Sequence, residues 1–181
     1  MLSTGGPAAG QNTELVEIRR AEPSDRSFIV EMARLACALN GRAVPDADDP
    51  ELTAVLPAAH DPMLIAVDGV ARPMGVVWTR LLDPPLIRDK AGRPVPELVI
   101  AVRPDKRGHG VGTGLPDAIA RVVAEQDEKL ALNVHLLNPA VRLYVRAGFR
   151  VAGRGRGWYG VAMTRPLDAG RDTRWNRKSA G

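Results

Sequence analysis

The feature that constrains this chain most is a set of glycines at alternate positions, shortly after a strand-like segment. Residues 98–102 are apolar, and after a short connection the sequence continues as Arg107-Gly108-His109-Gly110-Val111-Gly112. Glycine lets consecutive backbone N–H groups point into one concavity and lets the backbone approach a ligand closely. A helix predicted to follow the glycines brings its positive N-terminal end to the same place. The segment therefore predicts a phosphate-binding site, to which Arg107 and Lys106 add positive charge.

Two common phosphate-binding motifs do not fit this segment. A dinucleotide fingerprint requires G-x-G-x-x-G, but its last position is Thr113 when counted from Gly108 and Leu115 when counted from Gly110. A Walker loop requires a Gly-Lys pair, and the sequence contains none. The pattern that remains is V-x-P-x-x-R-G-x-G-x-G, which begins at Val102 and ends at Gly112.

A second segment lies downstream, with the sequence Asn138-Pro139-Ala140-Val141-Arg142-Leu143-Tyr144-Val145-Arg146-Ala147-Gly148-Phe149. The first pattern resembles the acetyl-CoA signature of the GNAT superfamily of N-acetyltransferases. The second resembles that family's N-x-x-A-x-x-L-Y-x-x-x-G-F segment, with one position shifted. The alternative for the glycine turn is a surface loop whose glycines only permit a tight entry into a helix.

Strand-like and helix-like segments alternate between the two ends of the chain. Hydrophobic periodicity predicts strands at 15–19, 63–67, 74–82, 98–102, 130–136, 149–152 and 158–163. Helices are predicted from a start at Pro23-Ser24-Asp25 to a stop at Asn40-Gly41, at 51–56, after the glycine turn, and between Asn138 and Gly148. This order is β-α-α-β-β-β-α-β-α-β-β, an α/β fold with a mixed sheet and helices on its faces. The resemblance adds a mostly antiparallel central sheet that splays between strands 4 and 5.

Composition predicts a disordered leader at residues 1–13 and a basic flexible tail at 168–181. The resemblance implies a GNAT-like acetyltransferase domain between them, at 14–167.

The resemblance implies a role for each residue of the donor site. Backbone groups of 98–102 would bind the pantetheine arm, and an N–H among Ile100, Ala101 and Val102 would polarise the acetyl oxygen. The diphosphate would be bound mainly by main-chain N–H groups of Arg107, Gly108, His109, Gly110, Val111 and Gly112. Asn138 would contact the cofactor arm, although it also suits a helix cap. Tyr144 would protonate the departing thiolate, and its alternative is a core aromatic with a satisfied hydroxyl.

The group that deprotonates the amine has two candidates. Glu97 opens the fourth strand, where several family members place this carboxylate, and its alternative is a charged strand-end residue that faces solvent. His135 ends the fifth strand and is the second candidate because histidine titrates near neutral pH. A lone histidine on an apolar strand is more often simply buried and hydrogen-bonded.

Other charged residues give weaker signals. Arg154 and Arg156, between glycines of the last hairpin, are candidates for binding a substrate carboxylate. An acidic loop would attract a cationic amine or be a solvated loop; its residues are Asp46, Asp48 and Asp49. His60 and His109 have no grouping with Cys, His or carboxylates at ligand spacing, so we predict no metal site.

Composition limits the remaining classes. The single cysteine, Cys37, excludes an internal disulfide. The longest apolar runs are too short to cross a bilayer and no export signal is evident, so we expect a cytoplasmic protein without a membrane partner. The net charge is +4, but two Phe and two Tyr offer little base stacking, which favours an anionic cofactor over nucleic acid. The oligomeric state stays open, and a homodimer is compatible with the sequence.

The sequence therefore favours transfer of an acetyl group from acetyl-CoA to a primary amine of an acceptor, by direct attack in a ternary complex. The alternatives are a GNAT-like module that senses acyl-CoA without turnover and, in third place, a nucleic-acid-associated protein that uses the basic tail. The glycine turn points to the donor, and it leaves the acceptor, a small molecule or a protein, open.

Overall fold

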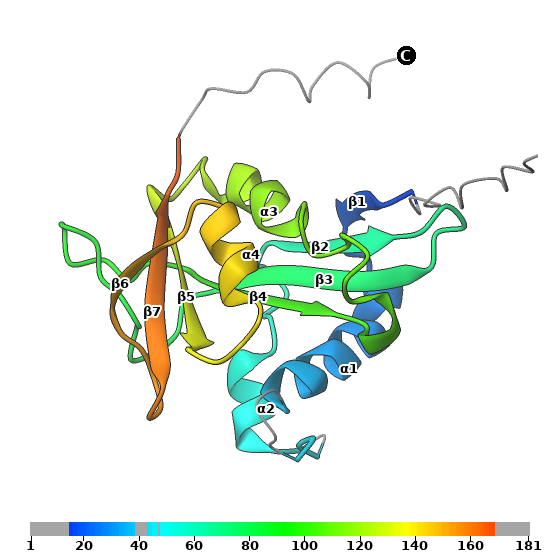
Figure 1. Cartoon of the computed structure of the whole chain (residues 1–181), viewed down its shortest axis with the longest axis horizontal. Coiled ribbons are helices and arrows are strands. Elements are labelled where there is room, and N and C mark those ends of the chain that lie inside the picture. Colours follow the sequence, from blue (N-terminus) through cyan, green and yellow to red (C-terminus); the bar gives the residue numbers. More distant parts are fainter. Residues whose placement is uncertain (1–14, 39–42, 47, 169–181) are drawn as a thin grey trace, which may run out of the picture.

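The computed structural model describes residues 15–38, 43–46 and 48–168 (Figure 1). The predicted leader, the tail beyond Asp168 and the helix stop at Asn40-Gly41 lie outside the described residues. The strands are β1 (Glu17–Arg20), β2 (Met63–Val67), β3 (Pro73–Arg80), β4 (Glu97–Val102), β5 (Lys129–His135), β6 (Arg150–Arg154) and β7 (Gly160–Pro166). The helices are α1 (Arg26–Cys37), α2 (Pro50–Val55), α3 (Leu115–Val123) and α4 (Val141–Arg146), with short 3₁₀ turns η1 (Pro23–Asp25) and η2 (Pro104–Lys106).

The seven strands form one mixed sheet in the order β1-β2-β3-β4-β5-β7-β6. Neighbouring strands are antiparallel except β4 and β5, which are parallel. This arrangement confirms the predicted α/β fold. In the described part of the chain, no helix is both long enough and apolar enough to cross a membrane.

Hydrophobic residues cover both faces of the sheet. Successive side chains of a strand point to opposite faces, and along β3 Val77 belongs to one core cluster while Val76 and Trp78 belong to the other. Helix α3 packs into the first cluster through residues such as Ile119, and α1 packs into the second through residues such as Met32. We call these the α3 face and the α1 face.

The sheet divides where β4 meets β5. These strands share a single register pair, Glu97 with Ala131, and the Ala131 N–H donates to the Pro96 carbonyl at 2.9 Å. By contrast, β4 pairs with β3 along its whole length, as β5 does with β7. The strands therefore diverge from Glu97 onward, and β5, β6 and β7 stand steeply across β3 and β4 (Figure 1). This divergence is the splay that the resemblance implies.

Several boundaries differ from the sequence-based expectation for local reasons. The first α-helix begins at Arg26, directly after the predicted start at Pro23-Ser24-Asp25, because Pro23–Asp25 forms a 3₁₀ turn. In the last hairpin the predicted strands 149–152 and 158–163 lie at Arg150–Arg154 and Gly160–Pro166. The pairing of these two strands contains a register shift between Val151 and Gly153.

The first helix is tied to the first strand by an ion pair. The Arg19 guanidinium donates to both carboxylate oxygens of Asp25, at 2.7 and 2.9 Å, and the Glu22 N–H donates to the same carboxylate at 2.8 Å. The Asp25 side chain is only 5% exposed. The hydrogen bond from Arg19 is the main cause that lowers the pKa of Asp25.

We expect Asp25→Asn to lower the free energy of unfolding by about 1.5–3 kcal/mol, the range for hydrogen bonds to charged groups. Because the pKa of Asp25 is lowered by folding, the folded state binds fewer protons there than the unfolded chain does. The stabilisation is therefore present at neutral pH and is lost as the pH falls below about 4. Urea denaturation at pH 7 and pH 3 measures both effects.

Glu31→Gln, on the exposed side of α1, is the control and should leave stability unchanged. A loss that is equally large for Asp25→Asn at both pH values would contradict the ion pair as its cause.

Candidate active site

The glycine turn lies directly after β4 and leads into α3. Gly108 and Gly110 adopt left-handed φ angles of +78° and +82°, a conformation that side chains with a Cβ rarely adopt. The N–H of Thr113 donates to the Gly110 carbonyl at 2.9 Å and closes the turn. Within the described chain, the backbone N–H groups of residues 108–112 donate no hydrogen bond. Unpaired backbone donors in a turn that leads into a helix are suited to an anion.

The other positions of the turn anchor it. Val111 is buried in the α3-face core, so it pins the turn directly after the exposed Gly110. A Cβ at Gly112 would make ordinary contacts, 3.5 Å from Val102 and 3.6 Å from Leu143. Glycine is therefore required by conformation at 108 and 110, and position 112 has no such requirement.

Arg107 folds back along the turn. Its Nε donates to the Val102 carbonyl at 3.1 Å, which places the guanidinium beside the C-terminal end of β4. The exposed His109 ring bonds only the Arg107 carbonyl, at 2.8 Å. The positive charge of Arg107 therefore lies at the entrance to the turn.

Among the residues that the structure describes, no strand pairs with the edge of β4 beyond Glu97 on the β5 side. Ile100, Ala101 and Val102 pair with Val77, Val76 and Gly75 of β3. Backbone groups that point away from β3 therefore face the gap, and an extended ligand can bond them as a strand would. The predicted donor residues of β4 and of the glycine turn thus lie along one continuous path.

Tyr144 lies on α4 with its ring in the α3-face core. The ring is 8% exposed and packs edge-on against Phe149, with centroids 6.0 Å apart. Its hydroxyl has no hydrogen-bond partner in the described part of the chain, where every fully buried side-chain oxygen or nitrogen has one. The hydroxyl therefore reaches the accessible surface. Burial of the ring raises the pKa of Tyr144, so the hydroxyl keeps its proton through the neutral range.

Asn138 organises the turn between β5 and α4. Its Oδ1 accepts from the Ala140 N–H at 2.9 Å, and its carbonyl accepts from the Val141 N–H at 3.0 Å. Ala140 occupies the N-cap position, so the expected cap at Asn138 lies two residues too early. Gly148 follows the helix with a φ of +86°, a left-handed conformation that favours glycine at a helix end.

Glu97 is buried and paired, which corrects the interpretation that it faces solvent. Its side chain is 5% exposed. Arg156 donates to Oε2 at 2.5 Å and to Oε1 at 2.8 Å, and the Leu86 N–H donates to Oε1 at 2.9 Å. The hydrogen bond to Glu97 is the main cause that raises the pKa of Arg156. Sequence reasoning named both residues but did not pair them, because they are separated by 59 positions.

The other candidates are placed differently. His135 ends β5, accepts from the Leu137 N–H at 3.2 Å through Nδ1, and lies 5.4 Å from the Tyr159 ring. Arg154 is exposed on β6. Asp49 caps α2 by accepting from the Glu51 N–H at 2.7 Å, and Asp46 and Asp48 are exposed. In the described residues, no group of three or more His, Cys, Asp or Glu is placed to hold a metal ion.

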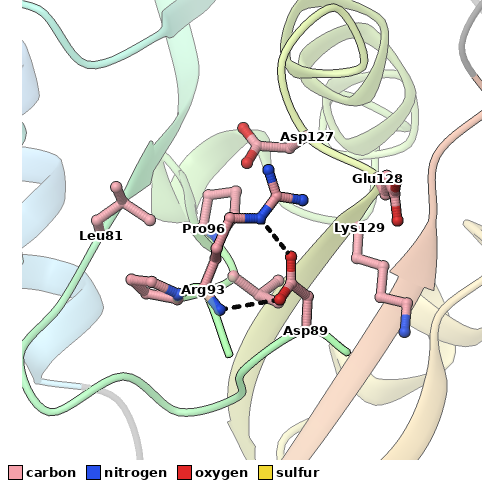
Figure 2. Close-up of a pocket in the computed structure, with 9 residues that line it drawn as sticks. Leu81, Asp89, Arg93, Pro96, Asp127, Glu128 and Lys129 are labelled. Atoms are coloured by element: carbon pink, nitrogen blue, oxygen red, sulfur yellow. Dashed lines mark hydrogen bonds and ion pairs between the residues drawn. The ribbon is translucent and has the colours of Figure 1, made fainter. Parts of the chain in front are cut away.

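A hollow in the surface lies elsewhere (Figure 2). It is lined by the loop before β4 and by the turn before β5, and Figure 2 shows the Asp89–Arg93 ion pair, 2.8 Å long, inside it. Desolvation raises the pKa of Asp127 there. This hollow is at the N-terminal ends of β4 and β5, whereas the glycine turn follows the C-terminal end of β4. It shares no residue with the glycine turn.

A splayed α/β sheet with a glycine-rich turn after β4 is the arrangement that the resemblance to acetyl-CoA-dependent acetyltransferases implies. The family model "Acetyltransferase (GNAT) domain" matches residues 63–151. The chain therefore carries an acetyltransferase domain of the GNAT family, which confirms the resemblance seen in its two segments. No curated protein matches the chain.

Solved structures share the fold. A GCN5-related N-acetyltransferase from Kribbella flavida is 24% identical with a TM-score of 0.62, and the match covers 84% of this chain and 98% of that one. A GNAT phosphinothricin acetyltransferase from Sinorhizobium meliloti, in complex with AcCoA, is 20% identical with a TM-score of 0.62, covering 91% and 97%. A GNAT-family acetyltransferase from Streptococcus pneumoniae is 20% identical with a TM-score of 0.61, covering 85% and 100%.

We expect Gly110→Ala to weaken acetyl-CoA binding about tenfold, because a Cβ at a left-handed φ costs about 1–2 kcal/mol and tilts the unpaired N–H groups. Isothermal titration calorimetry with acetyl-CoA measures the change in Kd. Gly92→Ala is a matched control, since Gly92 has a φ of +80° and equally open surroundings but lies outside the turn. An unchanged Kd in both variants would rule out the turn as the diphosphate site.

Proposed function

We propose that the protein transfers the acetyl group of acetyl-CoA to a primary amine by direct attack in a ternary complex. The observation that carries this proposal is the row of unpaired N–H groups at 108–112, next to the unpaired edge of β4. The GNAT family match supports it, as does a structural neighbour that was crystallised with AcCoA.

The donor would bind along the path described above. Residues 107–112 would hold the diphosphate through main-chain N–H groups and the charge of Arg107. The pantetheine arm would lie along β4 as an added strand, and an N–H among Ile100, Ala101 and Val102 would polarise the thioester carbonyl. Asn138 lies at the start of the α4 turn, where it would contact the arm.

The two proton-transfer groups would act from opposite faces of the sheet. Tyr144 belongs to the α3-face core. Glu97 alternates with Leu98, which also belongs to that core, so its side chain lies on the α1 face. A nucleophile activated by Glu97 and a thiolate protonated by Tyr144 would thus be on opposite sides of the gap. This separation suits an addition in which the amine enters and the sulfur leaves at one carbonyl carbon.

One observation favours a module that binds without turnover. Glu97 accepts hydrogen bonds from Arg156 at both oxygens, so an amine would first have to displace the guanidinium. Release of free CoA from acetyl-CoA in the presence of a panel of amines separates the two functions. Acetyl-CoA binding without CoA release across the panel would favour the sensor, and failure to bind acetyl-CoA would exclude both.

We expect Tyr144→Phe to lower kcat about 100-fold, the lower range for the loss of a general acid, while the Kd for acetyl-CoA changes little. The phenyl ring preserves the packing against Phe149, so thermal stability should be retained. Steady-state kinetics as a function of pH measure the effect. Tyr159→Phe makes the same change on an exposed tyrosine. An unchanged rate and pH profile for Tyr144→Phe would remove the acid assignment.

A further inference from the structure

The ion pair between Glu97 and Arg156 occupies the place where an acceptor amine would have to meet its base. Arg156 is in the turn between β6 and β7, and its backbone N–H is fixed by the Asn133 side chain at 2.8 Å. From there its guanidinium reaches Glu97 and also donates to the Pro84 carbonyl at 2.8 Å. The turn is therefore anchored by its backbone, while the guanidinium makes a separate contact that can be exchanged.

Exposure sets the direction from which a ligand can enter. The Arg156 side chain is 39% exposed, whereas the Glu97 side chain is 5% exposed. An incoming molecule therefore meets the guanidinium before it meets the carboxylate. The group best matched to a guanidinium is a carboxylate, which accepts two parallel hydrogen bonds from it.

The charges restrict which acceptors can open the pair. A simple amine that pairs with Glu97 leaves Arg156 without its carboxylate. An anion that pairs with Arg156 leaves Glu97 buried and unpaired, which costs free energy. A molecule that carries both an ammonium and a carboxylate replaces one ion pair by two. Its carboxylate pairs with Arg156, its ammonium pairs with Glu97, and no charge is left alone.

We propose that the acceptor is a zwitterion of the amino-acid type and that Arg156 determines this specificity by exchanging Glu97 for the acceptor carboxylate. This inference rests on the proposed acetyl transfer. The exchange delivers the ammonium to the base only when the correct acceptor is bound. Arg156 thus keeps Glu97 occupied until the acceptor arrives.

The reaction balances with the groups named. Glu97 takes one proton from the ammonium, and the freed nitrogen lone pair attacks the thioester carbonyl carbon. The C–S bond then breaks, and the thiolate takes the hydroxyl proton of Tyr144. The nitrogen loses a second proton, which replaces the one that Tyr144 gave, and Glu97 releases its proton to solvent. One N-acetyl amino acid, one CoA and one proton are formed per acetyl-CoA and zwitterionic acceptor.

The test compares the twenty common L-amino acids with their carboxamides as acceptors, with acetyl-CoA as donor. Each carboxamide keeps the amine and loses the carboxylate. For the best acceptor we expect kcat/KM for the acid to exceed that for the amide by about 10- to 100-fold, the range for a charged hydrogen-bonded contact. In Arg156→Gln this ratio should fall to near one, and in Arg156→Lys it should be intermediate because lysine lacks the planar fork.

Arg165→Gln is the matched control. It breaks another arginine–carboxylate pair of the same hairpin, with Asp117, on the side of the sheet that carries α3. It should leave the ratio between acid and amide unchanged, which separates loss of specificity from a general effect of removing an ion pair.

Each outcome of the panel is informative. The inference would be overturned if the wild type acetylated the amides with the same kcat/KM as the acids. It would also be overturned if Arg156→Gln kept the wild-type ratio between acid and amide. Either result would leave acetyl transfer intact. An absence of turnover with every member, while calorimetry still shows acetyl-CoA binding, also overturns it. Absence of acetyl-CoA binding would instead overturn the proposed function itself.

Discussion

The single register pair between β4 and β5 is the contact on which the rest of this structure depends. Longer pairing would close the gap where an extended ligand can bond β4, and no pairing would leave two separate sheets. Each half is held by its own antiparallel ladders, β1 to β4 on one side and β5 to β7 on the other. The residue at the junction, Glu97, acts twice. Its backbone joins the two halves, and its side chain ties the β6–β7 turn to them.

The divergence of the strands also explains why the glycine turn lies where it does. A chain that leaves β4 beside an open edge must turn away from the gap without covering it. Gly108 and Gly110 allow this through left-handed backbone angles, and Val111 directly after them is anchored in the core. The N–H groups are thereby left without acceptors at the mouth of the gap. An anion at this point would satisfy donors that the fold itself leaves unpaired.

Local features of this fold were predictable from the sequence, and contacts between distant segments were not. The strand-turn-helix at the glycines, the proline in the first turn of α3 and the left-handed Gly148 depend on neighbouring residues only. The last hairpin was misplaced because its register shift depends on pairing with β7. The Glu97–Arg156 pair forms only when the whole sheet has assembled. No local sequence pattern indicates a partner 59 residues away. The roles of individual side chains in catalysis stay predictions.

A contribution to the stability of the fold does not by itself explain the ion pair between Glu97 and Arg156. A buried ion pair gains little over apolar residues of similar volume, because desolvation offsets the attraction between the charges. Here the Glu97 side chain is almost fully buried and the Arg156 side chain is partly exposed. Solvent therefore weakens the attraction between the two charges further. What the pair provides is geometry, because two parallel hydrogen bonds fix the plane of the guanidinium and hold the turn against the start of β4. A fork that presents part of its surface to solvent, with a buried carboxylate behind it, has the charges that the proposed zwitterionic acceptor would need.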